Sequence, residues 1–404
     1  MTGTPWLAIV GIGEEGVEAL SPAARILLGG AAFVVGGARH LALAAPLLVG
    51  ERLSWPTPIA DGIPAILARR GAPVVVLASG DPFCFGIGSL LARHVPPGEM
   101  LCLPAPSAFS LACARLGWPM QETGLLSVCG RPVEGLLPAL QPGARLLVLC
   151  ADDESPRAVA ELLASRGFGG SVVHVLEALG GARARHRVFR ADGACPRAID
   201  RLNLLGIEVV AGPEARVITL ATGLPDEMFE HDGQLTKREV RAVTLSALAP
   251  RQGEMLWDIG SGSGSISIEW MLRHPANRAI AVERRADRAA RTMRNALSLG
   301  VPGLAVVGTA APQGLDGLPR PDAVFIGGGA TVPGVVDAAW AALRLGGRLV
   351  MNAVTIETET VLFEAHRRWG GTLGRVSVER LDRVGGLHWF RPAMTVTQYA
   401  AVKA

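Results

Sequence analysis

The stretch Trp257-Asp258-Ile259-Gly260-Ser261-Gly262-Ser263-Gly264 joins the end of an apolar run to the beginning of a helical pattern. Glycines at such a junction leave the backbone bare, so that a ligand can approach the amide groups at the helix start. Glu283 ends the next apolar run, where doubly wound nucleotide folds carry an acid that hydrogen-bonds ribose hydroxyls. The loop and the acid together predict a nucleoside site on a parallel sheet.

The spacing of the glycines narrows the choice of ligand. A dinucleotide fingerprint places a further glycine after Gly262 for close helix packing against a pyrophosphate, but the position where it is needed is Ser265. The order G-x-G-x-G suits a ligand with a ribose and no phosphate, such as S-adenosylmethionine. An antiparallel pair of late strands, expected at residues 374–380 and 394–400, is typical of methyltransferases with this kind of sheet.

The whole second half alternates strand-like and helical segments, which predicts a βαβ series and a Rossmann-like α/β fold. Its other strands are expected at residues 255–259, 279–283, 323–326 and 348–352. Its helices are expected at residues 238–248, 266–273, 286–299, 335–345 and 357–369.

The first half alternates in the same way, which predicts an α/β domain with a mostly parallel sheet. Ser21-Pro22 supplies an N-cap and a first-turn proline for one helix, which is expected to end at Gly29-Gly30. Strands are expected at residues 7–10, 32–35, 74–78, 146–150 and 172–176, with a weaker segment at 202–210.

Proline and glycine punctuation separates the halves around Gly212 to Asp226. We therefore predict two domains, residues 1–212 and residues 223–404. A chain of 404 residues is long enough for two domains of ordinary size.

Two segments of the second half carry a resemblance to a known family. They are Gly223-Leu224-Pro225-Asp226-Glu227-Met228-Phe229 and Leu235-Thr236-Lys237-Arg238-Glu239-Val240-Arg241, followed by the glycine loop. From Gly223 to the C-terminus the chain resembles the decarboxylating precorrin methyltransferase family that acts at carbon 15. The resemblance implies a class I methyltransferase fold and a methyl-donor site lined by Thr236, Gly260, Ser261, Gly262, Ser263, Gly264, Glu283 and Ala311.

The second half departs from related patterns at two places. The family usually has Gly-Asp-Ala-Pro where this chain has Thr309-Ala310-Ala311-Pro312, so an acid is missing on the adenine side. Enzymes of this fold that methylate amino groups or bases carry an Asn/Asp-Pro-Pro-aromatic clamp, whereas this chain has Phe325-Ile326-Gly327-Gly328-Gly329. Three glycines there suit a large flat substrate, or form only a flexible turn.

The first half carries a glycine loop of its own. Gly11-Ile12-Gly13-Glu14-Glu15-Gly16 matches G-x-G-x-x-G after a strand, which taken alone suggests NAD binding. The next strand ends in Val35-Gly36-Gly37 without an acid for a ribose, and the two glutamates would repel a pyrophosphate. We therefore interpret the loop as substrate-facing or structural.

Other pieces of the first half are more informative. Ala78-Ser79-Gly80-Asp81-Pro82-Phe83-Cys84-Phe85-Gly86-Ile87-Gly88 follows a strand, and Pro104-Ala105-Pro106-Ser107-Ala108 precedes a helix. With the first glycine loop and the Leu202-Asn203 ending, residues 6–210 resemble the tetrapyrrole methylase family, specifically the branch that methylates precorrin at carbon 5. The resemblance implies a class III methyltransferase fold and a donor held around Asp81, Cys84, Ser107 and Ala108.

Two of those positions allow a second interpretation. Asp81 precedes a proline, where an aspartate often closes an Asx-turn without touching a ligand. Cys84 stands where the branch more often has an aromatic or aliphatic residue, so we do not expect its side chain to be used.

Composition excludes several classes of protein. A net charge of +3, one tyrosine and no run of Lys or Arg argue against a nucleic-acid partner. No charge-free window is long enough for a membrane span, and Met1 to Val10 lack a secretory pattern, so we expect a cytoplasmic protein without a membrane partner. The six cysteines have neither CxxC spacing nor nearby histidines, so no metal site is expected.

The expected chemistry needs few protein groups. Methyl transfer to carbon is an in-line displacement on a sulfonium, for which alignment and desolvation supply most of the rate. The protein needs to bind substrate carboxylates and to move at most one proton. Lys237 and Arg241 are our candidates for carboxylate contacts because they adjoin Thr236, with His231, Arg238 and His388 as further charged residues near the expected mouth.

The two resemblances in one chain imply an enzyme of cobalamin biosynthesis that binds one S-adenosylmethionine in each domain. The implied reaction methylates precorrin-6Y at carbons 5 and 15, removes the carbon 12 acetate carboxylate and gives precorrin-8X. The equivalent step on a cobalt-precorrin, an NAD(P)-dependent oxidoreductase and a nucleic-acid or protein methyltransferase with an inactive first domain stay open. The expected partners are a small tetrapyrrole substrate and, in a homo-oligomer, further copies of the chain.

Overall fold

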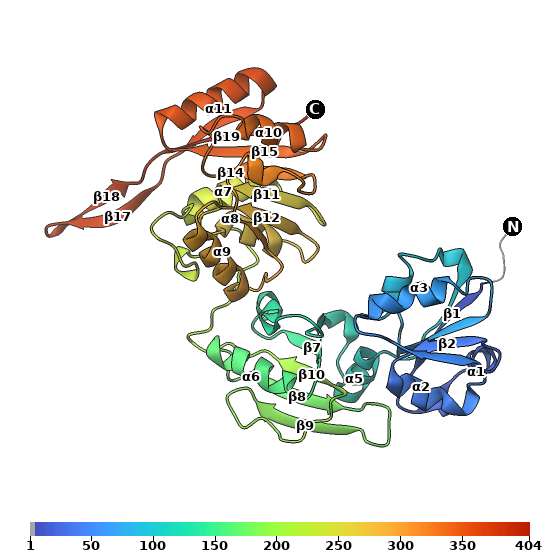
Figure 1. Ribbon diagram of the computed structural model, residues 1–404. Coiled ribbons are helices and arrows are strands. Elements are labelled where there is room, and N and C mark those ends of the chain that lie inside the picture. Colours follow the sequence, from blue (N-terminus) through green and yellow to red (C-terminus); the bar gives the residue numbers. More distant parts are fainter. Residues whose placement is uncertain (1–4) are drawn as a thin grey trace. The chain divides into compact units, whose positions relative to one another are not determined.

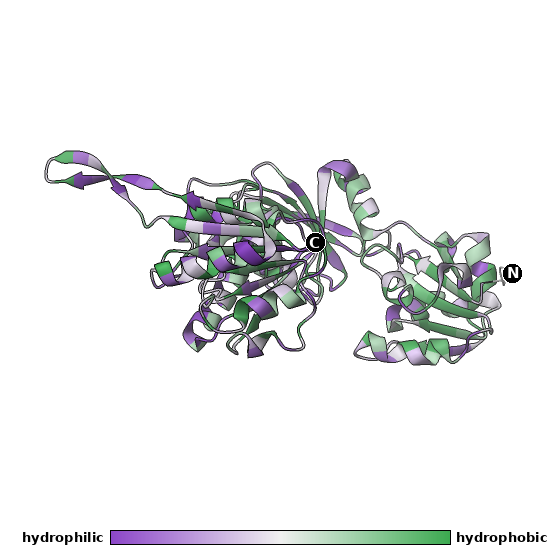
Figure 2. Ribbon diagram, turned by 90° about the horizontal axis from the view of Figure 1, so that it is seen from above, coloured by the Kyte–Doolittle hydropathy of each residue, from purple (hydrophilic) through white to green (hydrophobic). Residues whose placement is uncertain are grey.

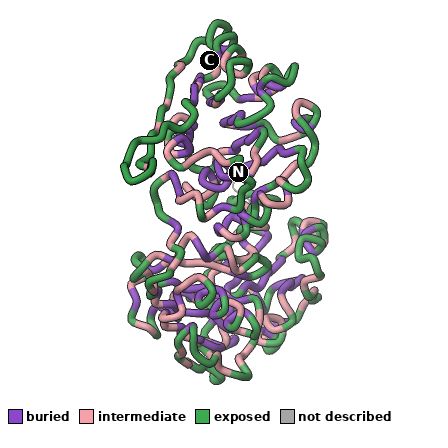
Figure 3. Tube along the Cα trace, turned by 90° about the vertical axis from the view of Figure 1, so that its left-hand side faces the viewer, coloured by how far each residue is buried: buried purple, intermediate pink, exposed green. Residues whose placement is uncertain are grey.

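The computed structural model describes residues 5–404, so Met1–Thr4, which begin the stretch searched for a secretory pattern, lie outside the described residues. Residue contacts divide the chain into two compact units. The first comprises Met1–Val133 and Gln141–Arg216, and the second comprises Glu134–Leu140 and Val217–Ala404. Buried residues form the interior of each unit (Figure 3).

The first sheet of the first unit is parallel throughout, in the order β3-β2-β4-β1-β5. Its strands β1 and β2 are labelled in Figure 1. Leu7 and Ile9 of one strand pack into one core cluster, whereas Ala8 and Val10 pack into another. Because successive side chains alternate between faces, this sheet is buried on both sides, which explains its continuous apolar runs (Figure 2). The strands are β1 (Leu7–Ile12), β2 (Phe33–Gly36), β3 (Glu51–Ser54), β4 (Val74–Ser79) and β5 (Met100–Leu103).

The second sheet of the first unit corrects our prediction of a mostly parallel sheet. Its order is β6-β7-β10-β8-β9, and only the pair β6–β7 is parallel. A short loop joins β8 to β9, and such a connection can only produce an antiparallel pair. The edge strand β9 contains three arginines, so its apolar pattern was too weak to predict. The strands are β6 (Thr123–Ser127), β7 (Arg145–Leu149), β8 (Val172–Glu177), β9 (Arg185–Arg190) and β10 (Asn203–Glu208).

The helices of the first unit connect these strands. The predicted start of the first helix is confirmed, because the Ser21 hydroxyl accepts a hydrogen bond from the Ala24 amide at 3.2 Å. The helices are α1 (Pro22–Gly29), α2 (Ala38–Ala44), α3 (Ile63–Leu67), α4 (Gly88–Leu91), α5 (Ala108–Leu116) and α6 (Ser155–Ser165).

The second unit is built on a seven-stranded sheet in the order β13-β12-β11-β14-β15-β19-β16. Its first five strands are parallel, and β19 runs antiparallel between β15 and β16, as in the predicted closing pair. The strands are β11 (Met255–Ile259), β12 (Arg278–Val282), β13 (Ala305–Val307), β14 (Ala323–Ile326), β15 (Arg348–Ala353), β16 (Thr372–Val376) and β19 (Val396–Val402).

Five helices of the second unit lie close to their predicted ranges. The helix α10 ends earlier than expected, because Leu343 takes an extended conformation and places its side chain in the core. The helices are α7 (Arg238–Leu248), α8 (Ser265–Leu272), α9 (Ala286–Ser298), α10 (Val335–Ala342) and α11 (Ile356–Trp369). Short 3-10 helices in the chain lie at Gly16–Ala19, Ala45–Leu47, Ile59–Gly62, Pro97–Glu99, Met120–Glu122, Val133–Ala139, Asp226–Met228 and Gln313–Leu315.

A two-stranded hairpin of the second unit was not predicted. Its strands, β17 (Glu379–Val384) and β18 (Leu387–Pro392), pair only with each other and extend away from the seven-stranded sheet (Figure 1). The strand predicted at 374–380 is therefore two strands, the end of β16 and the start of β17. Apolar side chains on the hairpin are more than half exposed, namely Leu381, Val384, Leu387 and Phe390.

Residues 5–404 contain neither a helix that could span a membrane nor a cluster of metal ligands. No helix among these residues has the length and apolarity needed to cross a bilayer. Nor does this part of the chain hold a group of three or more His, Cys, Asp or Glu side chains arranged for a metal ion.

Candidate functional site

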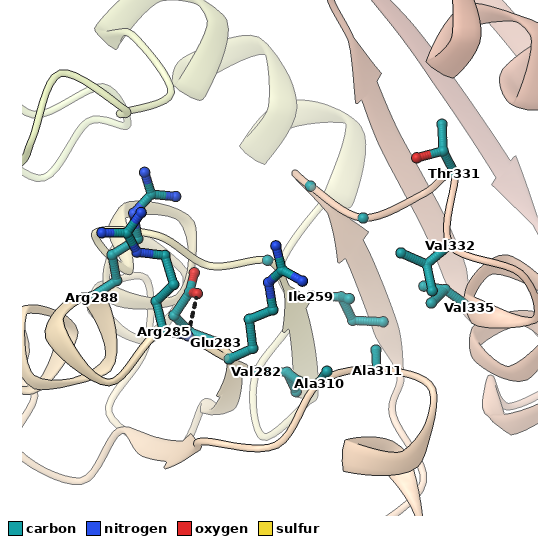
Figure 4. A pocket seen from close by; sticks show the side chains of 14 residues that line it. Ile259, Val282, Glu283, Arg285, Arg288, Ala310, Ala311, Thr331, Val332 and Val335 are labelled. Carbon is teal, nitrogen blue, oxygen red and sulfur yellow. Dashed lines mark hydrogen bonds between the residues drawn. The ribbon is translucent and has the colours of Figure 1, made fainter.

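A cavity of about 500 Å³ opens in the second unit where the parallel strands β11 and β12 end. Ligands of doubly wound sheets bind at this edge. Glu283, Arg285 and Arg288 lie on one side of the cavity, and Val332 and Val335 lie on the other (Figure 4). The remaining lining residues are Ile259, Gly260, Val282, Arg284, Ala310, Ala311, Gly328, Gly329 and Thr331.

The glycine loop takes a conformation that only glycine adopts readily. Gly260, Gly262 and Gly264 have φ angles of 71°, 60° and 76°, in the left-handed region. A Cβ on Gly260 would lie 2.6 Å from the carbonyl oxygen of Gly328. Bare backbone at Gly260 therefore lets the loop after β14 pack directly against the end of β11.

Glu283 is held in place by the backbone around it. Its Oε2 accepts a hydrogen bond from the Gly262 amide at 3.0 Å, and its Oε1 accepts one from the Arg285 amide at 2.9 Å. Each carboxylate oxygen keeps a second lone pair, so both can still accept a hydrogen bond from a ligand.

The structure brings some predicted donor-site residues together and keeps others behind the cavity wall. Gly260, Glu283 and Ala311 line the cavity. Ser261 has a buried hydroxyl without a hydrogen-bond partner among the described residues. Neither Ser261 nor the remaining four predicted residues line the cavity. The carbonyl groups of Gly262 and Ser263 accept hydrogen bonds from Thr292 and Asn295, respectively. Gly264 is the N-cap of α8, and the Thr236 carbonyl accepts a hydrogen bond from Arg241.

Asp258 lies fully buried beneath the glycine loop. Its Oδ2 accepts hydrogen bonds from the amide and the hydroxyl of Ser267, at 3.1 and 2.5 Å, and its Oδ1 has no partner among the described residues. Burial raises the pKa of Asp258 to about 6 against the lowering effect of the Ser267 hydrogen bonds, and Glu283 adds to the rise. This carboxyl group therefore changes charge close to neutral pH.

The prediction that Arg241 contacts a substrate carboxylate is wrong for this structure. Its side chain has no solvent exposure, and its guanidinium donates to Glu269 at 2.6 Å, to Asp226 at 3.1 Å and to the carbonyl groups of Leu224 and Thr236. Its donors are thus committed inside the protein. Arg241 fastens the segment before α7 to the body of the unit.

Lys237 is available to a ligand. It is partly exposed and lies 3.9 Å from Asp226. Lys237 lines a polar hollow of about 450 Å³ together with His231 and Arg238. Of the other candidates, His388 lies on the exposed hairpin strand β18 and is not part of this hollow.

A second cavity, of about 590 Å³, lies in the first unit where β1, β2 and β4 end. Much of its wall is apolar, and the backbone at Gly80 contributes one edge. A Cβ on Gly80 would lie 2.6 Å from the Pro106 carbonyl oxygen, so glycine allows the two loops to meet. The apolar lining includes Ile12, Trp55, Leu77, Phe85, Ile87, Phe109 and Leu176.

Three of the four residues predicted for the first donor site line this cavity, namely Cys84, Ser107 and Ala108. Asp81 does not, because its Oδ1 accepts a hydrogen bond from the Phe83 amide at 2.8 Å and closes an Asx-turn. Burial raises the pKa of the Cys84 thiol, a hydrogen bond with Ser107 opposes the rise, and Asp81 adds to it. Cys84 is therefore a neutral wall residue.

Sequence reasoning missed a polar cluster in the same cavity. Glu14, Arg39, His40 and Ser79 come from the ends of three strands and meet at one side. The signal in the sequence is the pair Arg39-His40, which follows the glycines Gly36-Gly37 after one intervening alanine at the end of a strand.

Comparisons with known proteins cover both units. A family model described as tetrapyrrole (corrin/porphyrin) methylases matches residues 7–193, and one described as a precorrin methyltransferase domain matches residues 227–403. A Sinorhizobium protein named precorrin-6Y C(5,15)-methyltransferase (decarboxylating) is 54% identical over 400 residues, which cover 99% of this chain and 97% of that protein.

Two shorter relatives each match less than half of the chain. A Salmonella typhimurium protein named cobalt-precorrin-7 C(5)-methyltransferase is 34% identical over 43% of this chain and 85% of its own length. A Saccharolobus solfataricus protein named "Probable cobalt-precorrin-6B C(15)-methyltransferase (decarboxylating)" is 33% identical over 37% of this chain and 77% of its own length. Since the identity to the Sinorhizobium protein extends over nearly the whole of both chains, this chain belongs to the family of decarboxylating precorrin-6Y C(5,15)-methyltransferases.

Proposed function

We propose that this methyltransferase transfers methyl groups from S-adenosylmethionine to carbons 5 and 15 of precorrin-6Y and releases the carbon 12 acetate carboxylate as carbon dioxide, giving precorrin-8X. The observation that carries the proposal is the pair of separate cavities, each at the carboxyl ends of parallel strands. We infer one donor molecule in each unit, with carbon 5 methylated in the first and carbon 15 in the second.

The residues of the second cavity fit the proposed methyl donor. Glu283 offers two oriented acceptor oxygens to the ribose hydroxyls. The Ser261 hydroxyl, buried in the adjoining loop, has no hydrogen-bond partner within residues 5–404. The small side chains of Ala310 and Ala311 leave room for a flat base. The donor supplies a sulfonium methyl group, and the cavity supplies alignment and partial exclusion of water.

The residues of the first cavity fit the donor in a different way. They offer an apolar wall lined also by Gly80, Pro106 and Ser107, with no acid where a ribose would need one in a Rossmann-like site. Contacts to backbone and apolar surface match the way the tetrapyrrole methylase resemblance implies that a donor is held. We therefore propose a donor site in this cavity that relies on backbone and apolar contacts, unlike the site in the second unit, which relies on Glu283.

Substrate carboxylates have cationic partners in the second unit. Lys237 and Arg238 lie in the polar hollow beside His231, and arginine and lysine both pair with carboxylates. The Arg238 Nε donates to the Gly223 carbonyl at 3.0 Å, which leaves its other guanidinium nitrogens for a ligand. We infer that this hollow binds acidic side chains of the tetrapyrrole.

The shorter relatives support the assignment of one methylation to each unit. One is named for carbon 5 alone and the other for carbon 15 with decarboxylation, and each matches less than half of this chain. The two names therefore divide the two methylations between proteins shorter than this chain. Both names specify a cobalt-precorrin, which keeps the cobalt-containing substrate as an alternative for this chain.

Mass spectrometry of products tests the proposal. Purified enzyme with precorrin-6Y and S-adenosylmethionine is expected to add two methyl groups and to release one carbon dioxide. Glu283→Ala should abolish the carbon 15 methylation and keep the carbon 5 methylation, whereas Ala108→Trp, which fills the first cavity, should do the reverse. Addition of only one methyl group by the unaltered enzyme, or loss of both methylations in either variant, would contradict two sites.

Two parallel assays separate the alternatives. Offering the metal-free and the cobalt-containing substrate to the same enzyme decides between the two routes by their rates. Calorimetric titration with NAD(P) and with S-adenosylmethionine decides the cofactor, since binding of the dinucleotide alone would favour an oxidoreductase.

We further propose that the protein acts in the cytoplasm as a homo-oligomer. The hairpin β17–β18 supports association, because a two-stranded ribbon is marginally stable alone and this one exposes apolar side chains on a free edge. Burial of Leu381 and Phe390, which pair across the hairpin, against another copy would remove that surface from water.

A further inference from the structure

A histidine, a serine and an arginine form a hydrogen-bonded group in the wall of the first cavity. Arg39 Nη2 donates to Ser79 Oγ at 2.9 Å and lies 2.8 Å from His40 Nε2. Ser79 Oγ lies 2.8 Å from the same nitrogen of His40. All three residues line the cavity, and Ser79, the last residue of β4, is exposed there.

The partners of His40 decide which ring nitrogen carries the lone pair. A guanidinium can only donate hydrogen bonds, so the nitrogen beside Arg39 must present a lone pair and the ring hydrogen must lie on Nδ1. Nδ1 is buried and has no partner among the described residues. The Ser79 hydroxyl therefore faces a basic nitrogen and can donate its hydrogen to it.

The charged groups around His40 keep the ring neutral. Burial and the adjacent Arg39 lower the pKa of His40 to about 4, while Glu14 raises it. Glu14 in turn is paired with Arg39 and with Arg183, which also pairs with Asp200. At neutral pH the ring is therefore neutral, and its Nε2 lone pair, which faces both Arg39 and Ser79, carries no proton.

Replacing hydrogen by methyl on an sp² ring carbon releases a proton, which needs an acceptor. We propose that Ser79 and His40 together accept the proton displaced from the ring carbon methylated in the first unit; this inference rests on the function proposed above. The other basic group of the lining near them, the Glu14 carboxylate, is paired with Arg39 and Arg183, so we assign the proton to Ser79 and His40.

The proposed step balances in atoms and electrons. A π pair of the ring forms the new carbon–carbon bond, and the bond from the methyl carbon to sulfur breaks with its electron pair left on sulfur. The ring carbon then loses its hydrogen as a proton, and that C–H pair restores the π system. The proton passes to Ser79 Oγ as the serine hydroxyl proton passes to His40 Nε2, and the imidazolium later releases it to water.

The test uses full-length enzyme and substrate deuterated at the ring carbon that the first unit methylates. His40→Gln and Ser79→Ala should each slow this methylation by about 10²-fold, the usual contribution of a general base. Proton removal should become rate-limiting in both, so a primary deuterium isotope effect should appear that is larger than that of the unaltered enzyme. Ser79→Thr keeps the hydroxyl and should restore most of the rate.

Controls separate this role from a structural one. Methylation and decarboxylation by the second unit, measured in the same reaction, should stay unchanged in each variant. His186→Gln, which alters a histidine on β9 that does not line the cavity, should leave both methylations unchanged. If His40→Gln prevents folding, Ser79→Ala at its exposed position carries the same prediction.

Two results would overturn the inference. One is an unchanged rate and isotope effect in both His40→Gln and Ser79→Ala. The other is a slowed methylation without any increase in the isotope effect, which indicates that the cluster only shapes the cavity. If instead the unaltered enzyme leaves that carbon unmethylated, the proposed function itself fails.

Discussion

Arg241 donates to Glu269 at 2.6 Å, and neither side chain has any solvent exposure. Glu269 also accepts hydrogen bonds from the amides of Gly223 and Leu224, at 2.7 and 2.9 Å. This buried pair therefore fastens the start of the segment that leads to Thr236 and Lys237. Arg241, which we predicted from the sequence to contact the substrate, instead holds the neighbouring segment in position.

Removing one partner of this pair should destabilise the second unit strongly. Arg241→Met leaves the Glu269 carboxylate buried without its partner, which costs about 3–5 kcal/mol. Chemical denaturation of the full chain, followed by tryptophan fluorescence to which the buried Trp257 and Trp270 contribute, should show the loss in the transition of this unit. Arg375→Met, which breaks the exposed pair with Glu359, should cost less than about 1 kcal/mol. Equal losses in the two variants would contradict the assignment.

Glu283→Gln should weaken donor binding in the second unit only. Charge-assisted hydrogen bonds are worth about 1.5–3 kcal/mol, so the dissociation constant should rise roughly 10- to 100-fold. Calorimetry should show two donor sites in the unaltered enzyme and one unchanged site in the variant. Glu357→Gln, at an exposed position on α11, is the matched control. If Glu283→Gln binds the donor at both sites with unchanged affinity, Glu283 does not contact the donor.

Asp258 should make the stability of the second unit depend on pH. The folded protein holds the Asp258 proton up to about pH 6, whereas the unfolded chain releases it near pH 3.8. The stabilising contribution is thus fully present below pH 3.8 and is lost as the pH rises to about 6, by about 3 kcal/mol in total.

Asp258→Asn isolates this effect from that of other carboxyl groups. The side-chain amide can still accept the hydrogen bonds from Ser267 and does not ionise. The variant should therefore not lose stability as the pH rises. The difference in unfolding free energy between variant and unaltered enzyme should therefore move in favour of the variant between about pH 4 and about pH 7. A difference that stays constant with pH would show that Asp258 does not titrate in this range.

The hairpin should determine the assembly state. Trp389→Ser combined with Phe390→Ser removes two exposed aromatic side chains of β18 and should lower the molar mass measured by light scattering after size-exclusion chromatography. Ile356→Ser, at a position on α11 that is more exposed than either aromatic residue, should leave the mass unchanged. A monomeric unaltered enzyme would refute the proposed homo-oligomer.

Local patterns determined most of the secondary structure and one site. The strand from Met255 to Ile259, the glycine loop and Glu283 were predictable because they are neighbours within one βαβ unit, where spacing alone places them at one edge. The N-cap at Ser21 was predictable for the same reason, since its hydrogen bond lies within one turn of helix. In each case the deciding contact is short in sequence.

Tertiary structure decided what depends on contacts between distant segments. Burial made Arg241 an internal anchor through Glu269, and the antiparallel sheet of the first unit arose from pairing that no single strand reveals. The cluster of Arg39, His40 and Ser79 exists only because β2 and β4 are neighbours in a parallel sheet. The periodicity of a segment shows which face of a helix or strand is apolar, but not which distant side chains will pack against that face. Burial from solvent and the pairing of charges both depend on those distant contacts.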